Sequence, residues 1–211
     1  MKDYGGVKNI FEEQNDETTK ELVSLGDHCV VALYLKKFGY KKCSYPFDWL
    51  ITNIDILIHI LEDDFRTFIK EPKFYKKFLK SGELFTHHNM KDNKDYFERC
   101  ITRFRKLKNK NTTFIISTSR TGGNNSVKLE ENHRDYVLDY YIKIVDILQN
   151  KYEIKNLQLV VLDLRPIEDD IYKYERLSSN IELHTIPVNL FGAILDKNSE
   201  NIIKKIYMDK I

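Results

Sequence analysis

One cysteine of this sequence lies where a thiol can act as a nucleophile. Cys29 follows a short apolar run over residues 21–25 and Gly26, and it precedes a stretch with helical apolar spacing. Main-chain amides at the start of a helix lower the pKa of a thiol and can bind an oxyanion that forms during acyl transfer. We therefore expect Cys29 to be a reactive thiol. The competing interpretation is a small side chain that packs in the core.

A nucleophilic cysteine needs a histidine base within hydrogen-bonding distance. Of the six histidines, His87 and His88 lie in a loop-like segment and are the best candidates. Adjacent positions project differently, so only one of the two is expected to face the thiol. His28 is next to Cys29, but we expect it to point elsewhere if a helix begins there. The remaining three have settings that indicate packing or solvation: His59, His133 and His184.

Other side chains could complete a site. Asp48 could orient the base as the third member of a triad, or it could only cap a turn between Phe47 and Trp49. Candidates for binding a substrate are Asp27, His28, Trp49 and Arg120. Trp49 could equally pack in the core, and a loop arginine such as Arg120 is more commonly solvated.

The elements that must position these residues alternate between strand and helix. Apolar runs predict strands over 21–25, 112–117, 157–164 and 181–186, and helical spacing predicts helices over 29–38, 54–61, 92–108, 132–152 and 198–211. Continuous apolar strands are typical of parallel sheets that are covered on both faces. We expect a layered α/β domain over 21–211, preceded by a polar arm over 1–20. Aromatic helices over 46–82 would form a cap or lid.

This topology would bring four polar segments together. Ligands of open parallel sheets bind outside the carboxyl ends of the strands. Residues 26–29, 118–120, 163–165 and 185–189 each follow or end a predicted strand. We therefore expect Cys29, Arg120 and Asp163 at the same edge of the sheet.

Composition excludes several classes of protein. The 211 residues carry 34 basic and 32 acidic side chains, a weaker basic excess than nucleic-acid binding by phosphate neutralisation needs. No apolar stretch reaches membrane-spanning length, and the polar start lacks a signal-peptide core, which favours a cytoplasmic protein without membrane contact. Three scattered cysteines without a CxxC pair, and the lack of a standard phosphate loop, indicate no metal and no cofactor. The oligomeric state stays open.

Two blocks carry a resemblance to a known family. The segment 24–50 reads SLGDHCVVALYLKKFGYKKCSYPFDWL, and it resembles the SLG-x-x-C-x-x-A-x-x-L and S-x-PFDW blocks of a family described as papain-like cysteine peptidases. A Phe-x-His segment before an arginine-rich helix is similar at Phe85 and His87 or His88. The resemblance implies Cys29 as the nucleophile and the His87–His88 pair as the source of the base. Because the family is called papain-like, a papain-like α+β fold is the alternative architecture.

Two functions follow as hypotheses. In the first, the protein is a cysteine-dependent hydrolase or acyl transferase that acts on a peptide, amide or ester. In the second, it is a non-catalytic module that binds a ligand such as a glycan, and its SLGDHC and PFDW blocks only build the pocket. A close approach of the Cys29 sulfur to an imidazole nitrogen is the observation that would favour the first.

Overall fold

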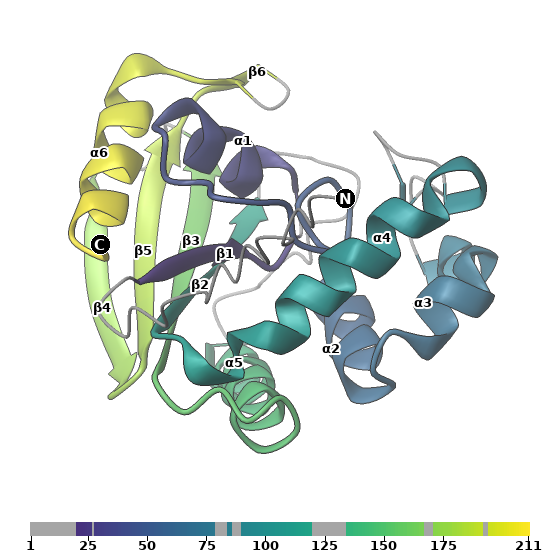
Figure 1. Ribbon diagram of the computed structural model, residues 1–211. Helices are drawn as coiled ribbons and strands as arrows, with labels where there is room; N and C mark the ends of the chain where they lie inside the picture. Colours follow the sequence, from purple (N-terminus) through teal and green to yellow (C-terminus); the bar gives the residue numbers. More distant parts are fainter. Residues whose placement is uncertain are drawn as a thin grey trace, which may run out of the picture.

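The chain folds around one five-stranded sheet. The computed structural model describes residues 20–26, 28–78, 84–85, 90–119, 134–166, 171–191 and 194–211. The strand order is β1-β2-β3-β5-β4, and Figure 1 shows the sheet with helices around it. The parallel strands are β1 (Glu21–Ser24), β2 (Thr112–Ser119), β3 (Leu157–Pro166) and β5 (Ile181–Val188). The predicted α/β class with a mostly parallel sheet is confirmed, and the papain-like α+β alternative is wrong.

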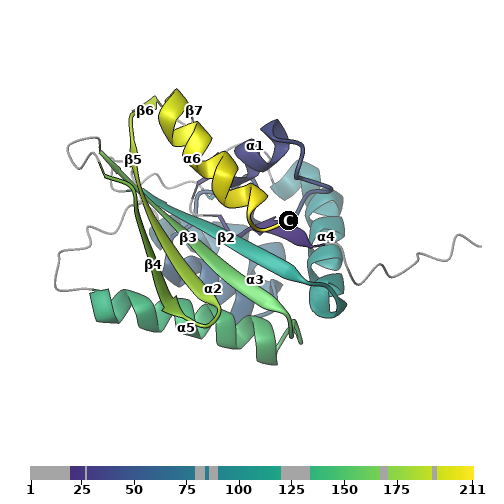
Figure 2. The same ribbon diagram turned by 90° about the vertical axis from the view of Figure 1, so that its left-hand side faces the viewer.

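One face of the sheet is covered by two helices. These are α1 (Val30–Lys37) and α6 (Lys197–Met208), which lie side by side on the same side of the strands in Figure 2. Val31 and Leu35 of α1 and Ile203 of α6 share a core with side chains of β2 and β3. Burial of apolar side chains on this face stabilises the sheet. Because helices cover both faces, the strands need no solvent-facing polar positions, which explains their continuous apolar runs.

The other face carries the larger core. It is covered by α2 (Ile54–Glu62), α3 (Arg66–Lys70), the 3₁₀ segment η1 (Pro72–Phe78), α4 (Met90–Arg105), the 3₁₀ turn η2 (Lys106–Asn109) and α5 (Arg134–Asn150). Asn53 caps the start of α2, because its side chain accepts the Ile56 N–H at 2.8 Å. Aromatic rings from several of these elements meet in one cluster.

Two helices of the predicted cap, α2 and α3, contribute to this core. Ile60, Leu61 and Phe68 are fully buried within it. Whether the segment 46–82 also moves as a lid stays a prediction, and the arm over 1–19 lies outside the described residues. Among the helices that the structure describes, none is both long and apolar enough to cross a membrane.

The sequence analysis did not predict the strand β4 (Lys173–Ser178). It pairs antiparallel with β5 at one edge of the sheet, and its sequence KYERLS has no apolar run. Its residues are exposed or half-buried, so the strand lacks the apolar run by which a buried strand is predicted. The short hairpin of β6 (Leu190–Phe191) and β7 (Ile194–Leu195) was missed for a similar reason, since each strand has two residues.

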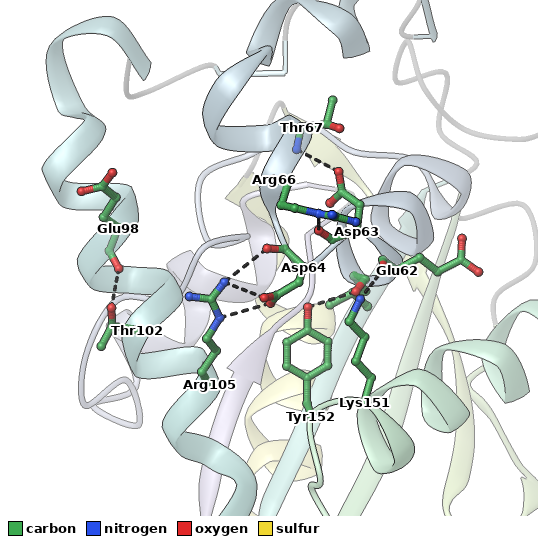
Figure 3. A network of polar contacts seen from close by, with 11 residues as sticks. Glu62, Asp63, Asp64, Arg66, Thr67, Glu98, Thr102, Arg105, Lys151 and Tyr152 are labelled. Atoms are coloured by element: carbon green, nitrogen blue, oxygen red, sulfur yellow. Dashed lines mark hydrogen bonds and ion pairs between the residues drawn. The ribbon is translucent and has the colours of Figure 1, made fainter.

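A strained corner joins α2 to α3. Asp64 and Phe65 both have positive φ, 54° and 63°, which is uncommon for residues other than glycine. Figure 3 shows how α4 fastens this corner: the Arg105 guanidinium donates to both carboxylate oxygens of Asp64, at 3.1 and 2.8 Å, and to its carbonyl at 3.2 Å. From the end of α5, the Tyr152 hydroxyl donates to the Leu61 carbonyl at 3.0 Å. These contacts and the burial of Phe65 hold the corner.

Removing this clamp is expected to have a modest cost. Arg105→Ala should lower the free energy of unfolding by about 1 kcal/mol, because the pair is bidentate but its charges are solvent-exposed. Urea denaturation measures the change. Arg99→Ala, at an exposed position on the same helix, is the control and should change stability by less. Equal costs for the two variants would contradict a clamp at Asp64.

Candidate active site

Cys29 lies at the carboxyl edge of the parallel strands. β1 ends at Ser24, Gly26 turns the chain with φ +88°, and α1 begins at Val30 with Cys29 as its N-terminal flanking residue. The thiol is half-buried. The strand and helix predicted around Cys29 are therefore present. Helix geometry leaves the first amides of α1 without main-chain acceptors inside the helix.

The surroundings of the thiol differ from the sequence-based expectation in two respects. Burial raises the pKa of the Cys29 thiol, and a backbone hydrogen bond at the helix start lowers it by less, so the expected low pKa is wrong for this structure. The His28 ring does not point elsewhere, because its Nδ1 lies 3.6 Å from Cys29 Sγ. No sequence signal predicted this contact, since it depends on the backbone turn between Gly26 and α1.

The loop before Cys29 packs against the block that contains PFDW. A Cβ atom at Gly26 would lie 2.6 Å from Thr52 Oγ1 and 3.6 Å from Phe47 Cβ. Thr52 and Phe47 are both buried. Gly26 is therefore required both by its positive φ and by this close approach, and the two sequence blocks meet at this point.

Substitution of this glycine is expected to destabilise the protein more than substitution of an open one. Gly26→Ala should lose about 1–2 kcal/mol of stability from backbone strain, and the contact with Thr52 adds to that loss. Gly39→Ala is the matched control, because Gly39 also has positive φ (+79°) but nothing lies within 4 Å of its added Cβ. Thermal or urea denaturation of both variants measures the difference. A Gly26→Ala protein as stable as Gly39→Ala would show that the Gly26–Thr52 approach relaxes freely.

The same block contacts the segment that leads toward the two histidines. Leu50 and Phe85 form an isolated antiparallel bridge, and the Ile51 N–H donates to the Leu84 carbonyl at 3.0 Å. Within the described residues, strand pairing in this segment is limited to this bridge. His87 and His88 themselves lie outside the described residues.

Asp48 is buried and already has partners. Its Oδ2 accepts the Tyr45 N–H at 2.8 Å and pairs with the Lys41 ammonium, and the side chain is 1% exposed. Burial raises the pKa of Asp48, while the Lys41 charge opposes that rise. Oδ1 is buried without a hydrogen-bond partner among the described residues. These contacts favour the interpretation of Asp48 as a turn cap over its interpretation as a carboxylate that orients an imidazole.

The structure describes only some of the candidates for substrate binding. Trp49 is half-buried, and the Lys41 ammonium lies 5.9 Å from its ring centroid. Asp27 and Arg120 lie outside the described residues. The sequence analysis did not predict the contacts of Lys41 with Asp48 and Trp49. In a lysine-rich chain, a single lysine does not stand out as the partner of a particular carboxylate or ring.

Asp163 lies at the same edge of the sheet as the Cys29 loop. The register pairs it with Thr118 on β2 and with Thr185 on β5, and all four parallel strands end at this edge. Its carboxylate accepts from Arg165 Nε at 2.8 Å and lies 3.5 Å from the Thr118 hydroxyl. Alternation along β3 directs Asp163 to the face opposite α1, because its neighbours Leu162 and Leu164 pack on the α1 side. Asp163 therefore lies at the same edge as the Cys29 loop, and its side chain points to the face that α1 does not cover.

Within the described ranges, no cluster of three or more histidine, cysteine or acidic side chains could hold a metal ion. The three cysteines are free thiols, with Cys29 and Cys43 half-buried and Cys100 buried. The described part of the site thus offers a thiol, an imidazole and a helix start as its chemistry.

Comparison with known proteins agrees with the two sequence blocks. Residues 20–118, just under half of the chain, match the family described as "Putative papain-like cysteine peptidase (DUF1796)", which confirms the predicted resemblance. A stretch of 47 residues is 45% identical to "Uncharacterized protein R408" of Acanthamoeba polyphaga mimivirus. That stretch covers 22% of this chain and 21% of the viral protein. No solved structure matches the chain.

Proposed function

We propose that this chain, in which residues 20–118 match the cysteine peptidase family, is a cysteine-dependent hydrolase that cleaves an amide or ester bond. One observation carries the proposal: three separate segments pack together at the carboxyl edge of the sheet. The Cys29 loop contacts Thr52, and the neighbouring Leu50–Ile51 pairs with Leu84–Phe85 just before the two histidines. This packing brings the two sequence blocks that match the family into contact with the segment that precedes His87 and His88.

The reaction requires a base because the resting thiol is protonated. With its pKa raised by burial, Cys29 transfers its proton to an imidazole as the sulfur attacks the substrate carbonyl carbon. The resulting oxyanion is stabilised by amides in the first turn of α1. The imidazolium then protonates the leaving amine or alcohol, and the carbon–nitrogen or carbon–oxygen bond breaks to leave a thioester. Water, deprotonated by the same imidazole, hydrolyses that thioester and releases the acid.

His87 or His88 is the proposed base. The two residues follow Phe85 by only two and three positions in the sequence, and Phe85 is bridged to Leu50 of the PFDW block. His28 is the competing candidate because of its contact with the resting thiol. Asp48 is proposed as a positioning residue at most, since Lys41 and the Tyr45 amide occupy one of its oxygens.

Three histidine variants are expected to separate these roles. Replacing the true base by alanine should lower the rate of acyl transfer by about 100-fold or more, and the rate should no longer rise with pH through the imidazole range. Hydrolysis of p-nitrophenyl acetate by His28→Ala, His87→Ala and His88→Ala measures this effect. A large loss in His28→Ala alone would reassign the base to His28. Unchanged rates in all three variants would contradict a cysteine–histidine hydrolase.

One observation favours the alternative function. A thiol whose pKa is raised by burial is a poor nucleophile on its own, as expected for a module that only binds a ligand. In that case Asp27, Trp49 and Arg120 would be recognition residues. A glycan array then discriminates the two functions: the module should bind with wild-type affinity after Cys29→Ala, whereas a hydrolase without glycan affinity should show no signal.

A further inference from the structure

We propose that a cavity beneath α6, at the β4 edge of the sheet, binds a small anionic ligand that carries a flat aromatic ring. The cavity has a volume of about 460 Å³ and is lined by β4, β5 and the last turns of α6. β1 and β4 are the two edge strands, so this cavity is separate from the candidate active site. Its size falls within the usual range for small-molecule sites.

Two ionisable side chains are buried at the base of the cavity. Glu182 is 4% exposed and His184 is 5% exposed. Glu182 accepts from Arg176 at 3.1 Å and pairs with Lys210, so two cations surround this one carboxylate. Buried charges of this kind are costly unless they are paired, and here the pairing leaves the carboxylate satisfied.

His184 retains an unused hydrogen-bonding atom. Its Nδ1 lies 2.8 Å from the Tyr172 hydroxyl, which fixes the ring. Its Nε2 is buried and has no hydrogen-bond partner among the described residues, because the nearest Glu182 oxygen is 3.6 Å away. A buried polar atom without a hydrogen bond destabilises the folded state.

Aromatic side chains form one wall beside this imidazole. The Tyr172 ring is stacked on His184 at a centroid distance of 6.0 Å and an interplanar angle of 27°. The Tyr174 ring lies 5.1 Å from the same imidazole. Both tyrosines keep large exposed fractions, 40% and 50%. Ile202 and Ile206 of α6 add apolar lining. Half-exposed rings above an apolar lining suit a flat ligand ring, which would cover them.

The charges of the lining favour an anion. Arg176, Lys205 and Lys210 contribute three positive charges against the carboxylates of Glu182 and Asp209. Burial lowers the pKa of His184, which keeps the imidazole neutral at pH 7. Lys205 is exposed and pairs with no carboxylate that the structure describes, so it is the cation available to a ligand. Nucleoside monophosphates and aromatic carboxylates share the required ring and anionic group.

The test is titration of the full chain with adenosine 5′-monophosphate and with 4-hydroxybenzoate, followed by calorimetry and by the ¹⁵N shifts of His184. At least one probe should bind to the wild-type protein and shift the His184 signals. The same probe should bind about fivefold more weakly to Lys205→Ala. Lys204→Ala is the matched control, because Lys204 is on the same helix but lies 5.9 Å over the Phe38 ring, outside the cavity. Its affinity should equal that of the wild type.

Three results would overturn the proposal. The first is binding of neither probe into the millimolar range. The second is inorganic phosphate binding as tightly as adenosine 5′-monophosphate, which would exclude a role for the ring. The third is equal loss in Lys204→Ala and Lys205→Ala, which would indicate nonspecific charge attraction. Labelling of Cys29 is measured in the same samples, so failure here is distinct from failure of the proposed hydrolase.

Discussion

Cys29→Ala is expected to abolish acyl transfer from p-nitrophenyl acetate, with a loss of about 1,000-fold or more in the rate of the chemical step. In the proposed mechanism the Cys29 sulfur forms the covalent intermediate, so its removal leaves the reaction without a nucleophile. The wild-type protein should release nitrophenolate in a burst and carry an acetyl group on Cys29, which mass spectrometry detects.

The other cysteines provide the controls for this experiment. Cys43 is half-buried like Cys29, but it packs against the larger core rather than at a helix start. Cys43→Ala should keep the burst and the acetylated Cys29 peptide. Acetylation that moves to Cys43, or a burst that survives Cys29→Ala, would place the reactive group elsewhere. A folded Cys29→Ala protein, verified by circular dichroism, excludes loss of structure as the cause.

Phe104→Ala is expected to be the most destabilising single substitution considered for this fold, at about 3–5 kcal/mol. Phe104 is fully buried on α4, and its ring contacts Phe47, Phe65 and Tyr152 at centroid distances of 6.0, 5.6 and 5.3 Å. Truncation leaves a cavity where the PFDW block, the α2–α3 corner and the end of α5 meet. Urea denaturation measures the loss.

Phe38→Ala is the comparison for this variant. Phe38 also contacts several rings, including Tyr34 and Tyr207, but it is half-buried on the other face of the sheet. Its truncation removes less area from the core, so the cost should be clearly smaller. Equal costs would show that the aromatic cluster around Phe104 does not act as the main packing centre. Because Phe47 belongs to this cluster, Phe104→Ala should also loosen the block that contacts the Cys29 loop.

Periodicity alone predicted most elements of this fold. The buried strands β2, β3 and β5 have apolar runs such as LQLVVLDL, and the helix α4 has a clear apolar stripe, so local pattern and tertiary burial agree. β4 failed the same analysis, because the charged sequence KYERLS becomes a strand only through its hydrogen bonds to β5. An edge strand draws its order from its neighbour rather than from burial of its own side chains.

The local sequence pattern was sufficient to place Cys29 after a strand and a glycine, at the start of a helix. The surroundings of that thiol and of its neighbours follow from the folded structure and could not be predicted from the pattern. Burial raises the pKa of Cys29 against the local effect of the helix start, His28 approaches the sulfur, and Lys41 takes Asp48 as its partner. Spacing along the chain encodes helices and strands because these depend on near neighbours. Desolvation and ion pairing depend on what other segments bring into contact, and no local pattern records that.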